Sequence, residues 1–240
     1  MLSVSPEHNF LNQILGVIPA RGGSKRILNK NLQNLNGVPL IDHTIDFANR
    51  LSIKNCYVSS DNDEIRRRVW GNVTAPFRRP AEASRDESTD LEWLLHAIDF
   101  HNNHSDDAVS HVLILRPTSP IRDFKKALEV IELGLKNNKS VRSVKKIPTK
   151  MCPSWAIKKS DSGFSTLFPD GFLTRSQDIE DFYYPTGVYD LVHVETFLRT
   201  KKMYGENFMI VNDEHSFPND IDTYEDLEFF QKNFDTLTTL

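Results

Sequence analysis

Apolar runs and helical patterns alternate along the first 140 residues of the chain. The apolar runs are ILGVIPA, NCYVSSD, NVTAPF and HVLILRP, which begin at Ile14, Asn55, Asn72 and His111. Between and after them, helical patterns predict helices from about Pro39 to Leu51, after Asn62, from about Thr89 to His101 and from about Phe124 to Lys136. Strand–helix alternation of this kind predicts an α/β fold, with a mostly parallel sheet flanked by helices on both faces.

The alternation stops near residue 140. From 140 to 212 the chain consists of short irregular pieces rich in proline, glycine and aromatic residues, and a helical pattern resumes near Tyr224. We expect residues 1–240 to form a single domain, in which 140–212 is an insertion. That insertion is expected to fold back over the edge of the sheet or onto a partner subunit.

Composition excludes several classes of protein. A formal net charge of −4 gives no general reason to bind nucleic acid or an anionic membrane, so anion recognition must be local. Cys56 and Cys152 lie far apart without a C-x-x-C pattern, which favours reduced thiols in a cytoplasmic protein over a disulfide or a zinc site. The stretch up to Asn12 is polar, and no segment approaches the roughly 18 apolar residues of a membrane span. We therefore expect no membrane partner.

Three segments with chemically useful side chains come directly after predicted strands. They are Ala20–Asn31, Ser59–Asp61 and Arg116–Arg122. Ligands of open α/β sheets bind at the carboxyl ends of the strands. The sequence therefore predicts that these segments converge on one edge of the sheet.

The first segment is unusually basic. In VIPARGGSKRILNKN, Gly22 and Gly23 allow a sharp turn and a close approach of backbone amides to an anion. Four cations surround them: Arg21, Lys25, Arg26 and Lys30. Neither a Walker sequence nor G-x-G-x-x-G is present. The pattern alone is consistent with a phosphate-binding loop and equally with a solvated basic turn.

The stretch IPARGGSKRILNKNL resembles the nucleotide-binding signature of the CMP-sialic acid synthetase family, the cytidylyltransferases that activate nonulosonic acids. Further similar segments follow in the same order: YVSSDNDEI, RRPAEASRDEST, LILRPTSPIRD, TRSQDIEDFYYPTGVYDL and NDIDTYEDLE. The resemblance implies a Rossmann-like nucleotidyltransferase with a small dimerisation insertion, and hence a homodimer. It also implies a Mg²⁺-dependent reaction of CTP with a 2-keto sugar acid, which yields a CMP-sugar and pyrophosphate.

The resemblance also implies which residues meet the nucleotide. Arg21 and Lys30 would stabilise charge at the reacting phosphorus. The expected nucleotide-binding residues are Gly22, Gly23, Ser24, Lys25, Asn31 and Arg79. Among these, Arg79 matches a family arginine near the cytidine, although an arginine after a strand is often a surface residue.

The residues expected to bind the acceptor include two at which the chain departs from the family. Thr118 and Ser119 lie in a rigid turn between two prolines, and Arg175 matches a family arginine placed against the sugar acid. Arg116 stands where the family commonly has glutamine, and Tyr184 stands where members that use N-acetylneuraminic acid often have a second arginine. We therefore expect a related acid, for example a deoxy or diamino nonulosonate, to be preferred.

Asp220 and Asp222 lie two apart just before the last predicted helix. In extended backbone their carboxylates point to the same side, and hard oxygen ligands suit Mg²⁺. A D-x-D before a helix is by itself more often a cap and a solvated acid. The resemblance assigns this D-I-D to the metal.

The leading hypothesis is a CTP:nonulosonate cytidylyltransferase. Two alternatives remain open from the sequence. One is nucleotidyl transfer to a sugar phosphate or to Kdo, and the other is a catalytically silent nucleotide-binding subunit. The second alternative is weakened because both aspartates and the cations of the loop are present.

Overall fold

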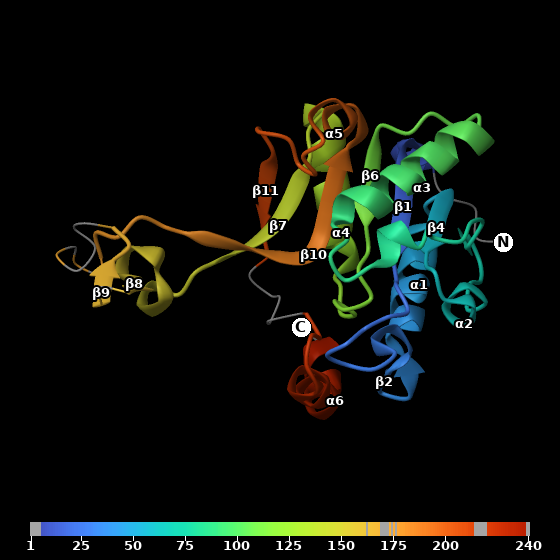
Figure 1. Cartoon of the computed structure of the whole chain (residues 1–240). Helices are drawn as coiled ribbons and strands as arrows, with labels where there is room; N and C mark the ends of the chain where they lie inside the picture. Colours follow the sequence, from blue (N-terminus) through green and yellow to red (C-terminus); the bar gives the residue numbers. More distant parts are fainter. Residues whose placement is uncertain are drawn as a thin grey trace.

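The computed structural model describes residues 6–161, 163–168, 173, 175, 177–213 and 220–238. A seven-stranded sheet forms its centre, in the order β11-β7-β10-β6-β1-β4-β5 (Figure 1). The strands are β1 Ile14–Pro19, β4 Asn55–Ser59, β5 Val73–Thr74, β6 His111–Ile114, β7 Val141–Lys146, β10 Tyr183–His193 and β11 Met209–Asn212. Only β10 runs antiparallel to its neighbours in this sheet of described residues. The predicted mostly parallel α/β sheet is confirmed.

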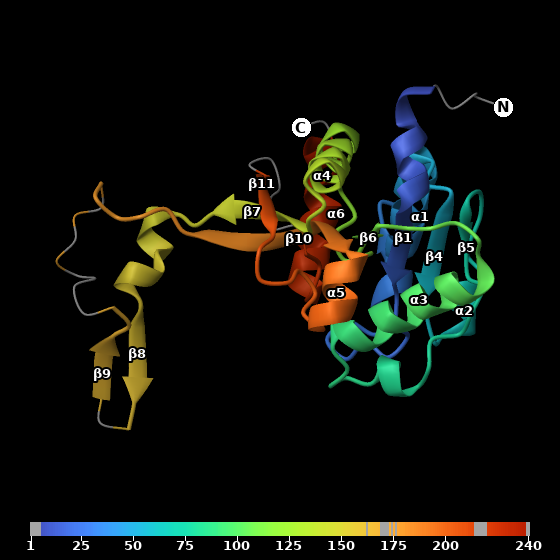
Figure 2. The ribbon, with the colours of Figure 1, turned by 90° about the horizontal axis from the view of Figure 1, so that it is seen from above.

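Helices cover both faces of the sheet. They are α1 Leu40–Leu51, α2 Asp63–Arg66, α3 Asp90–His104, α4 Phe124–Asn137, α5 Val194–Thr200 and α6 Tyr224–Thr238. α1 and α4 lie on one face, and α3 and α5 lie on the other (Figure 2). The predicted helices agree with these bounds within a few residues, whereas β5 is shorter than the apolar run NVTAPF.

Short pieces complete the chain. They are the 3-10 helices η1 Pro6–Gln13, η2 Lys30–Leu32, η3 Glu82–Ser84, η4 Thr149–Met151 and η5 Pro153–Trp155, and two small ladders that pair β2 Asn34–Leu35 with β3 Val38–Pro39 and β8 Ile157–Ser160 with β9 Gly163–Thr166. Among the described helices, none is long and apolar enough to cross a membrane.

The central strand β1 is apolar on both sides because both faces of the sheet are covered. Ile14 and Ile18 pack in the core with α1 and α4, whereas Leu15 and Val17 pack in the core with α3. Continuous burial of this strand fixes its position between β4 and β6. Its carboxyl end therefore delivers the basic loop to the middle of the sheet edge.

The part of the chain that leaves the sheet is shorter than the sequence predicts. β7, β10 and β11 all belong to the central sheet, so within 140–212 the described residues that extend away from the sheet lie between 147 and 182. These described residues are here called the excursion. A hydrogen bond from the Ile147 amide to the Phe182 carbonyl, 2.8 Å long, closes its base. Figures 1 and 2 both show the excursion projecting from the body.

Candidate active site

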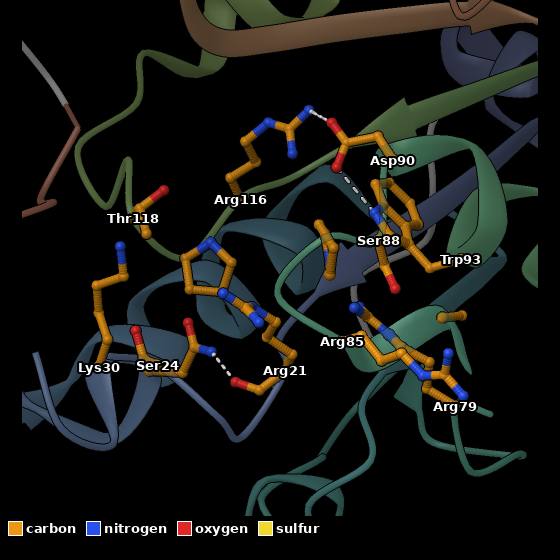
Figure 3. A pocket seen from close by; sticks show the side chains of 14 residues that line it. Arg21, Ser24, Lys30, Arg79, Arg85, Ser88, Asp90, Trp93, Arg116 and Thr118 are labelled. Carbon is orange, nitrogen blue, oxygen red and sulfur yellow. Dashed lines mark hydrogen bonds and ion pairs between the residues drawn. The ribbon is translucent and has the colours of Figure 1, made fainter. Parts of the chain in front are cut away.

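Of the three strand-end segments that the sequence predicts to converge, Ala20–Asn31 and Arg116–Arg122 line one cavity of about 200 Å³, whereas Ser59–Asp61 contributes no lining residue to this cavity. It lies at the carboxyl ends of β1 and β6, beside the chain that leads from β5 into α3 (Figure 3). The lining residues are Pro19, Arg21, Ser24, Lys30, Asn31, Arg79, Ala83, Arg85, Ser88, Asp90, Trp93, Arg116, Pro117 and Thr118. Five of these are basic and one is acidic, so the cavity favours an anionic ligand.

The backbone of the basic loop is held by the neighbouring strand end. The Gly22 amide donates to Asp61 Oδ1 over 2.8 Å, and the Asn31 side chain donates to the Arg21 carbonyl over 2.9 Å. A Cβ atom on Gly22 would lie 2.9 Å from the Cβ of Asn62, so this close approach requires glycine. In this arrangement the Gly22 amide is engaged by Asp61, and the expectation that Gly22 binds the nucleotide stays a prediction.

Two exposed acids hold the cations of the loop. Arg21 Nη1 lies 2.7 Å from Asp86 Oδ1, and Lys25 pairs with the same carboxylate. Lys30 Nζ lies 2.8 Å from Asp222 Oδ1, and Arg26 lies 2.8 Å from the other oxygen of Asp222. Arg21 and Lys30 also line the cavity. These two residues can therefore exchange a carboxylate for a phosphate without a change of fold.

Arg79 is fixed on the opposite wall. Its side chain is only 4% exposed, and it donates to the Ser59 hydroxyl over 3.0 Å and to the Ser59 carbonyl over 2.6 Å. Its guanidinium carbon lies 5.7 Å from the centroid of a Trp93 ring. Burial lowers the pKa of Arg79 to about 10, so it stays charged at neutral pH.

Arg116 is tied to two carboxylates. Its Nη2 atom lies 2.6 Å from Asp90 Oδ2 and 3.6 Å from Oδ2 of the buried Asp190. Burial opposes the charge of Arg116, but Asp90 and Asp190 outweigh burial and raise its pKa. Asp90 also accepts the Trp93 indole N–H over 2.9 Å. The charge of Arg116 is therefore largely neutralised within the protein.

Arg122 supports the turn that carries Arg116. It donates to the Arg116 carbonyl over 2.6 Å and to the Thr44 hydroxyl over 3.3 Å. Burial lowers the pKa of this guanidinium to about 10. Because the Ser119 amide donates to the same Arg116 carbonyl over 3.1 Å, Arg122 helps to fix this turn.

The segment with Asp220 and Asp222 is joined to this turn. The Ile221 amide donates to the Thr118 carbonyl over 2.8 Å. The loss of water around Asp220 raises the pKa of its carboxyl group. The nearby charge of Asp222 raises this pKa further, whereas a hydrogen bond with Thr118 lowers it. Partial burial works against the charge of Asp222, but Lys30 and Arg26 prevail and hold its pKa below the ordinary value. The described residues contain no cluster of three or more His, Cys, Asp or Glu that could hold a metal by itself.

Seven of the expected site residues line the cavity: Arg21, Ser24, Lys30, Asn31, Arg79, Arg116 and Thr118. The other eight do not line it: Gly22, Gly23, Lys25, Ser119, Arg175, Tyr184, Asp220 and Asp222. Lys25 pairs with Asp86, which also pairs with the lining residue Arg21, and Asp222 pairs with the lining residue Lys30. Ser119 is buried. Arg175 is exposed on the excursion, and Tyr184 lies in β10 at the base of the excursion, opposite Lys145.

Sequence reasoning missed part of the wall. Arg85, Ser88, Asp90 and Trp93 line the cavity together with Arg79. The signal was present in RRPAEASRDEST and in the start of the following helix. Thr89 caps that helix through the Leu91 amide, and this cap places Asp90 and Trp93 in its first turn.

A family model described as cytidylyltransferase matches residues 15–234. The chain belongs to this family. It is 34% identical over 197 residues to the CMP-N,N'-diacetyllegionaminic acid synthase of Legionella pneumophila, and the match covers 81% of each chain. It is 30% identical over 222 residues to an N-acylneuraminate cytidylyltransferase of Streptococcus agalactiae, and that match covers 88% of this chain and 50% of the relative. The chain thus spans about half the length of the first curated relatives that it matches.

Other comparisons bear on the breadth of the family and on the fold. A pseudaminic acid cytidylyltransferase of Campylobacter jejuni is 26% identical, with 90% of this chain and 93% of the relative covered. The solved structure of CMP:2-keto-3-deoxy-manno-octonic acid synthetase complexed with CTP aligns with a TM-score of 0.65 at 15% identity, covering 93% of this chain and 99% of that one. A 4-diphosphocytidyl-2C-methyl-D-erythritol synthase from Anaerococcus prevotii aligns with a TM-score of 0.62 at 16% identity, covering 92% and 98%. These two structures confirm the Rossmann-like nucleotidyltransferase fold.

Proposed function

We propose that the protein transfers CMP from CTP to the anomeric hydroxyl of a nonulosonic sugar acid and releases pyrophosphate. The observation that carries this proposal is the cavity with five basic lining residues at the carboxyl ends of the parallel strands, in a chain of the cytidylyltransferase family. Relatives named for N-acylneuraminate, diacetyllegionaminic acid and pseudaminic acid support a nonulosonic acid as the acceptor.

The basic loop would stabilise the leaving group. The anomeric hydroxyl would give up its proton to water, and its oxygen would attack the α-phosphorus in line. The bond from the α-phosphorus to the oxygen that bridges to the β-phosphorus would break, and that oxygen would leave with the pyrophosphate. Negative charge would then grow on the pyrophosphate, and Arg21 and Lys30, which both line the cavity, would stabilise it. Arg21 and Asp86 are both partly exposed, and exposed ion pairs are worth only about 0–1 kcal/mol, so Arg21 can leave Asp86 for phosphate at little cost in free energy.

Asp220 and Asp222 would hold a Mg²⁺ ion in this proposal. Carboxylate oxygens fit the ion, and a pair of them leaves positions for phosphate oxygens and water. Asp222 fits this role because it is ionised and already lies against Lys30, which lines the cavity. When bound, the ion would neutralise charge on the phosphates. Asp222 would then exchange its pair with Lys30 for the metal, which would leave Lys30 available to the phosphates.

A homodimer is part of the same proposal. The excursion carries exposed apolar side chains, namely Met151, Ile157, Phe164, Leu167 and Leu173. A two-stranded ladder such as β8–β9 is marginal alone, so a second copy that covers these side chains would stabilise it. The molar mass of wild type and of Phe164→Asp, measured by light scattering, tests this part. A wild type that is monomeric at micromolar concentration contradicts it.

The cytoplasm is the proposed location. Cys56 and Cys152 are both free and buried, which supports a reducing compartment.

The direct test is release of pyrophosphate from CTP in the presence of a panel of acids. The panel contains neuraminic, legionaminic, pseudaminic and Kdo-type acids, with a sugar phosphate as a further acceptor. We expect pyrophosphate and a sugar with a single nucleotide phosphate, formed only with a nonulosonic acid and lost on addition of a chelator. A product with two phosphates identifies transfer to a sugar phosphate, and CTP binding without turnover identifies a silent subunit.

A further inference from the structure

The protein itself engages four of the five basic side chains that line the cavity. The pairs are Arg21 with Asp86, Lys30 with Asp222, Arg79 with Ser59 and Arg116 with Asp90. Arg85 is different: among the described residues, its side chain has no hydrogen bond, ion pair or ring contact with another group. Its positive charge is therefore available to a ligand.

The backbone presents Arg85 to the cavity. Arg85 directly follows η3 in an extended conformation, and its carbonyl accepts the Ser88 amide over 3.2 Å. Figure 3 shows Arg85 on the same side of the cavity as Arg79 and Ser88, across from Lys30 and Thr118. The residue is thus anchored through its main chain, and its exposed side chain is free to close on a ligand.

A second cavity, of about 490 Å³, adjoins the first and shares Arg79 and Arg85 with it. Its other lining residues are Asp61, Arg78, Pro80, Ala81 and Ser84. Arg78 lines this second cavity only, and it is paired with Asp63 at 3.0 Å. Arg85 and Arg78 are therefore two neighbouring exposed arginines, of which only Arg85 faces the first cavity without an acid partner.

An exposed arginine is usually a solvated surface residue, but the next residue argues for a different role here. Asp86 is the next residue in the sequence, and it is therefore the acid nearest to Arg85 along the chain. Asp86 nevertheless pairs with Arg21 and Lys25 of the loop and not with Arg85. The loop cations are thus neutralised while the charge of Arg85 is left uncompensated in a cavity that is already positive. A guanidinium in that position suits bidentate binding of a planar carboxylate or a phosphate.

We propose that Arg85 binds an anionic oxygen group of the substrates, either a phosphate of the nucleotide or the carboxylate of the sugar acid. The identity of these ligands rests on the proposed function. Arg116 supplies no free cation because Asp90 and Asp190 hold it. Tyr184 has no cationic group and lies outside the cavity lining. Arg85 takes the place that those two positions leave open.

Three variants of the full chain test this inference: Arg85→Gln, Arg85→Lys and the control Arg78→Gln. CTP affinity is measured by calorimetry with Mg²⁺, and KM for CTP and for each acid is measured by pyrophosphate release. We expect Arg85→Gln to weaken the binding of one substrate by about tenfold or more, because a charge-assisted contact is lost. Arg85→Lys should recover part of the loss, and Arg78→Gln should stay within about twofold of wild type.

The two sources of the anion give different patterns. Weaker CTP binding identifies a phosphate as the partner of Arg85, whereas unchanged CTP affinity with a raised KM for the acid identifies the carboxylate. If Arg85→Gln changes neither quantity more than Arg78→Gln does, the inference is wrong.

The role of Arg85 and the proposed reaction can be tested separately. If the wild type releases no pyrophosphate with any acid, the proposed reaction is wrong. If that protein still binds CTP, and Arg85→Gln weakens this binding, the role of Arg85 is supported. In a wild type without turnover, a CTP affinity that Arg85→Gln leaves unchanged overturns the inference.

Discussion

The two walls of the cavity carry the same kind of charge in different ways. On the loop wall, Arg21 and Lys30 pair with Asp86 and Asp222, whose side chains are 31% and 38% exposed. On the opposite wall, Arg79 is 4% exposed and bound to the buried Ser59 of a strand end. Arg116 pairs with the partly exposed Asp90 at 2.6 Å and also reaches Asp190, which is 1% exposed, at 3.6 Å. The acids that hold the loop wall are both partly exposed, whereas Arg79 and Arg116 of the opposite wall each have at least one buried partner, Ser59 or Asp190.

This difference suggests separate roles for the two walls in the reaction and in substrate recognition. An exposed ion pair contributes about 0–1 kcal/mol, so the loop wall can exchange its partners during a reaction. Removing one partner of a buried pair costs about 3–5 kcal/mol, so the opposite wall keeps its arrangement. The loop wall is therefore suited to a charge that changes, and the opposite wall to recognition of a fixed outline.

The largest effect is expected where the loop wall meets the two aspartates. Asp220→Asn and Asp222→Asn should each lower turnover on the order of a hundredfold or more, because metal ligands are lost. Circular dichroism should show an unchanged fold. The matched control is Glu225→Gln, an exposed acid in the first turn of α6. Unchanged rates in both aspartate variants remove the metal assignment.

The next effect concerns the cations of the loop wall. Arg21→Ala and Lys30→Ala should lower kcat about tenfold or more, since charge on the pyrophosphate rises in the transition state. Lys25→Ala should do less, because Lys25 lies outside the cavity lining. Steady-state kinetics with varied CTP give kcat and KM separately. A change in KM alone would demote Arg21 and Lys30 to ground-state binding.

The loop must also be positioned, and Asp61 does this through the Gly22 amide. Asp61→Ala should raise KM for CTP several-fold, on the order of one lost charged hydrogen bond. Asp61→Asn keeps an acceptor at the same place and should recover most of the affinity. Equal loss in both variants would show that the charge of Asp61, and not its hydrogen bond, matters.

The opposite wall should affect the choice of acceptor. We expect N-acetylneuraminic acid not to be the best acceptor of the wild type, and Arg116→Gln to change the ranking of acids by a few-fold, because Asp90 then loses its cation. The measurement is kcat/KM across the acid panel for both proteins. If the wild type prefers N-acetylneuraminic acid, the specificity argument is wrong and the cytidylyltransferase assignment stands.

The last prediction concerns a residue of the sheet far from both walls, where we expect little effect on activity and a pH-dependent effect on the stability of the fold. Burial, and to a lesser extent His193, lowers the pKa of His111 from 6.5 to about 4. Between these values the unfolded chain binds a proton that the folded protein does not, so stability falls as the pH drops below 6.5. The contribution is about 2 kcal/mol between pH 7 and pH 5. Urea unfolding of wild type and His111→Gln at both pH values measures it, and an equal pH dependence in the two proteins contradicts it.

Local patterns were sufficient to predict much of the fold. β1 and β6 are short apolar runs buried on both faces, and α1 and α4 have clear apolar stripes, so each could be assigned without its partners. β7 and β10 could not. VRSVKK and YYPTGVYDLVH mix polar and apolar residues, and their place in the sheet depends on a long-range antiparallel pairing with a register shift between Pro185 and Asp190.

The site, like the fold, could be predicted only in part. Motif resemblance identified Arg21, Lys30, Arg79 and Arg116 at the cavity. It did not identify which acids hold them, because Asp86, Asp222 and Asp190 come from distant parts of the chain. Those partners decide which charges remain free, and so the role of Arg85 could not be inferred from sequence.

A crystal structure with CTP and Mg²⁺ tests the central claim most directly. The account predicts that the β- and γ-phosphates lie against Arg21 and Lys30, with the metal on Asp220 and Asp222, while Arg79 keeps its contacts with Ser59 and Arg116 keeps its contact with Asp90. A triphosphate bound away from Arg21 and Lys30, for example beside Arg78 in the second cavity, would contradict the division between an exchanging loop wall and a fixed opposite wall.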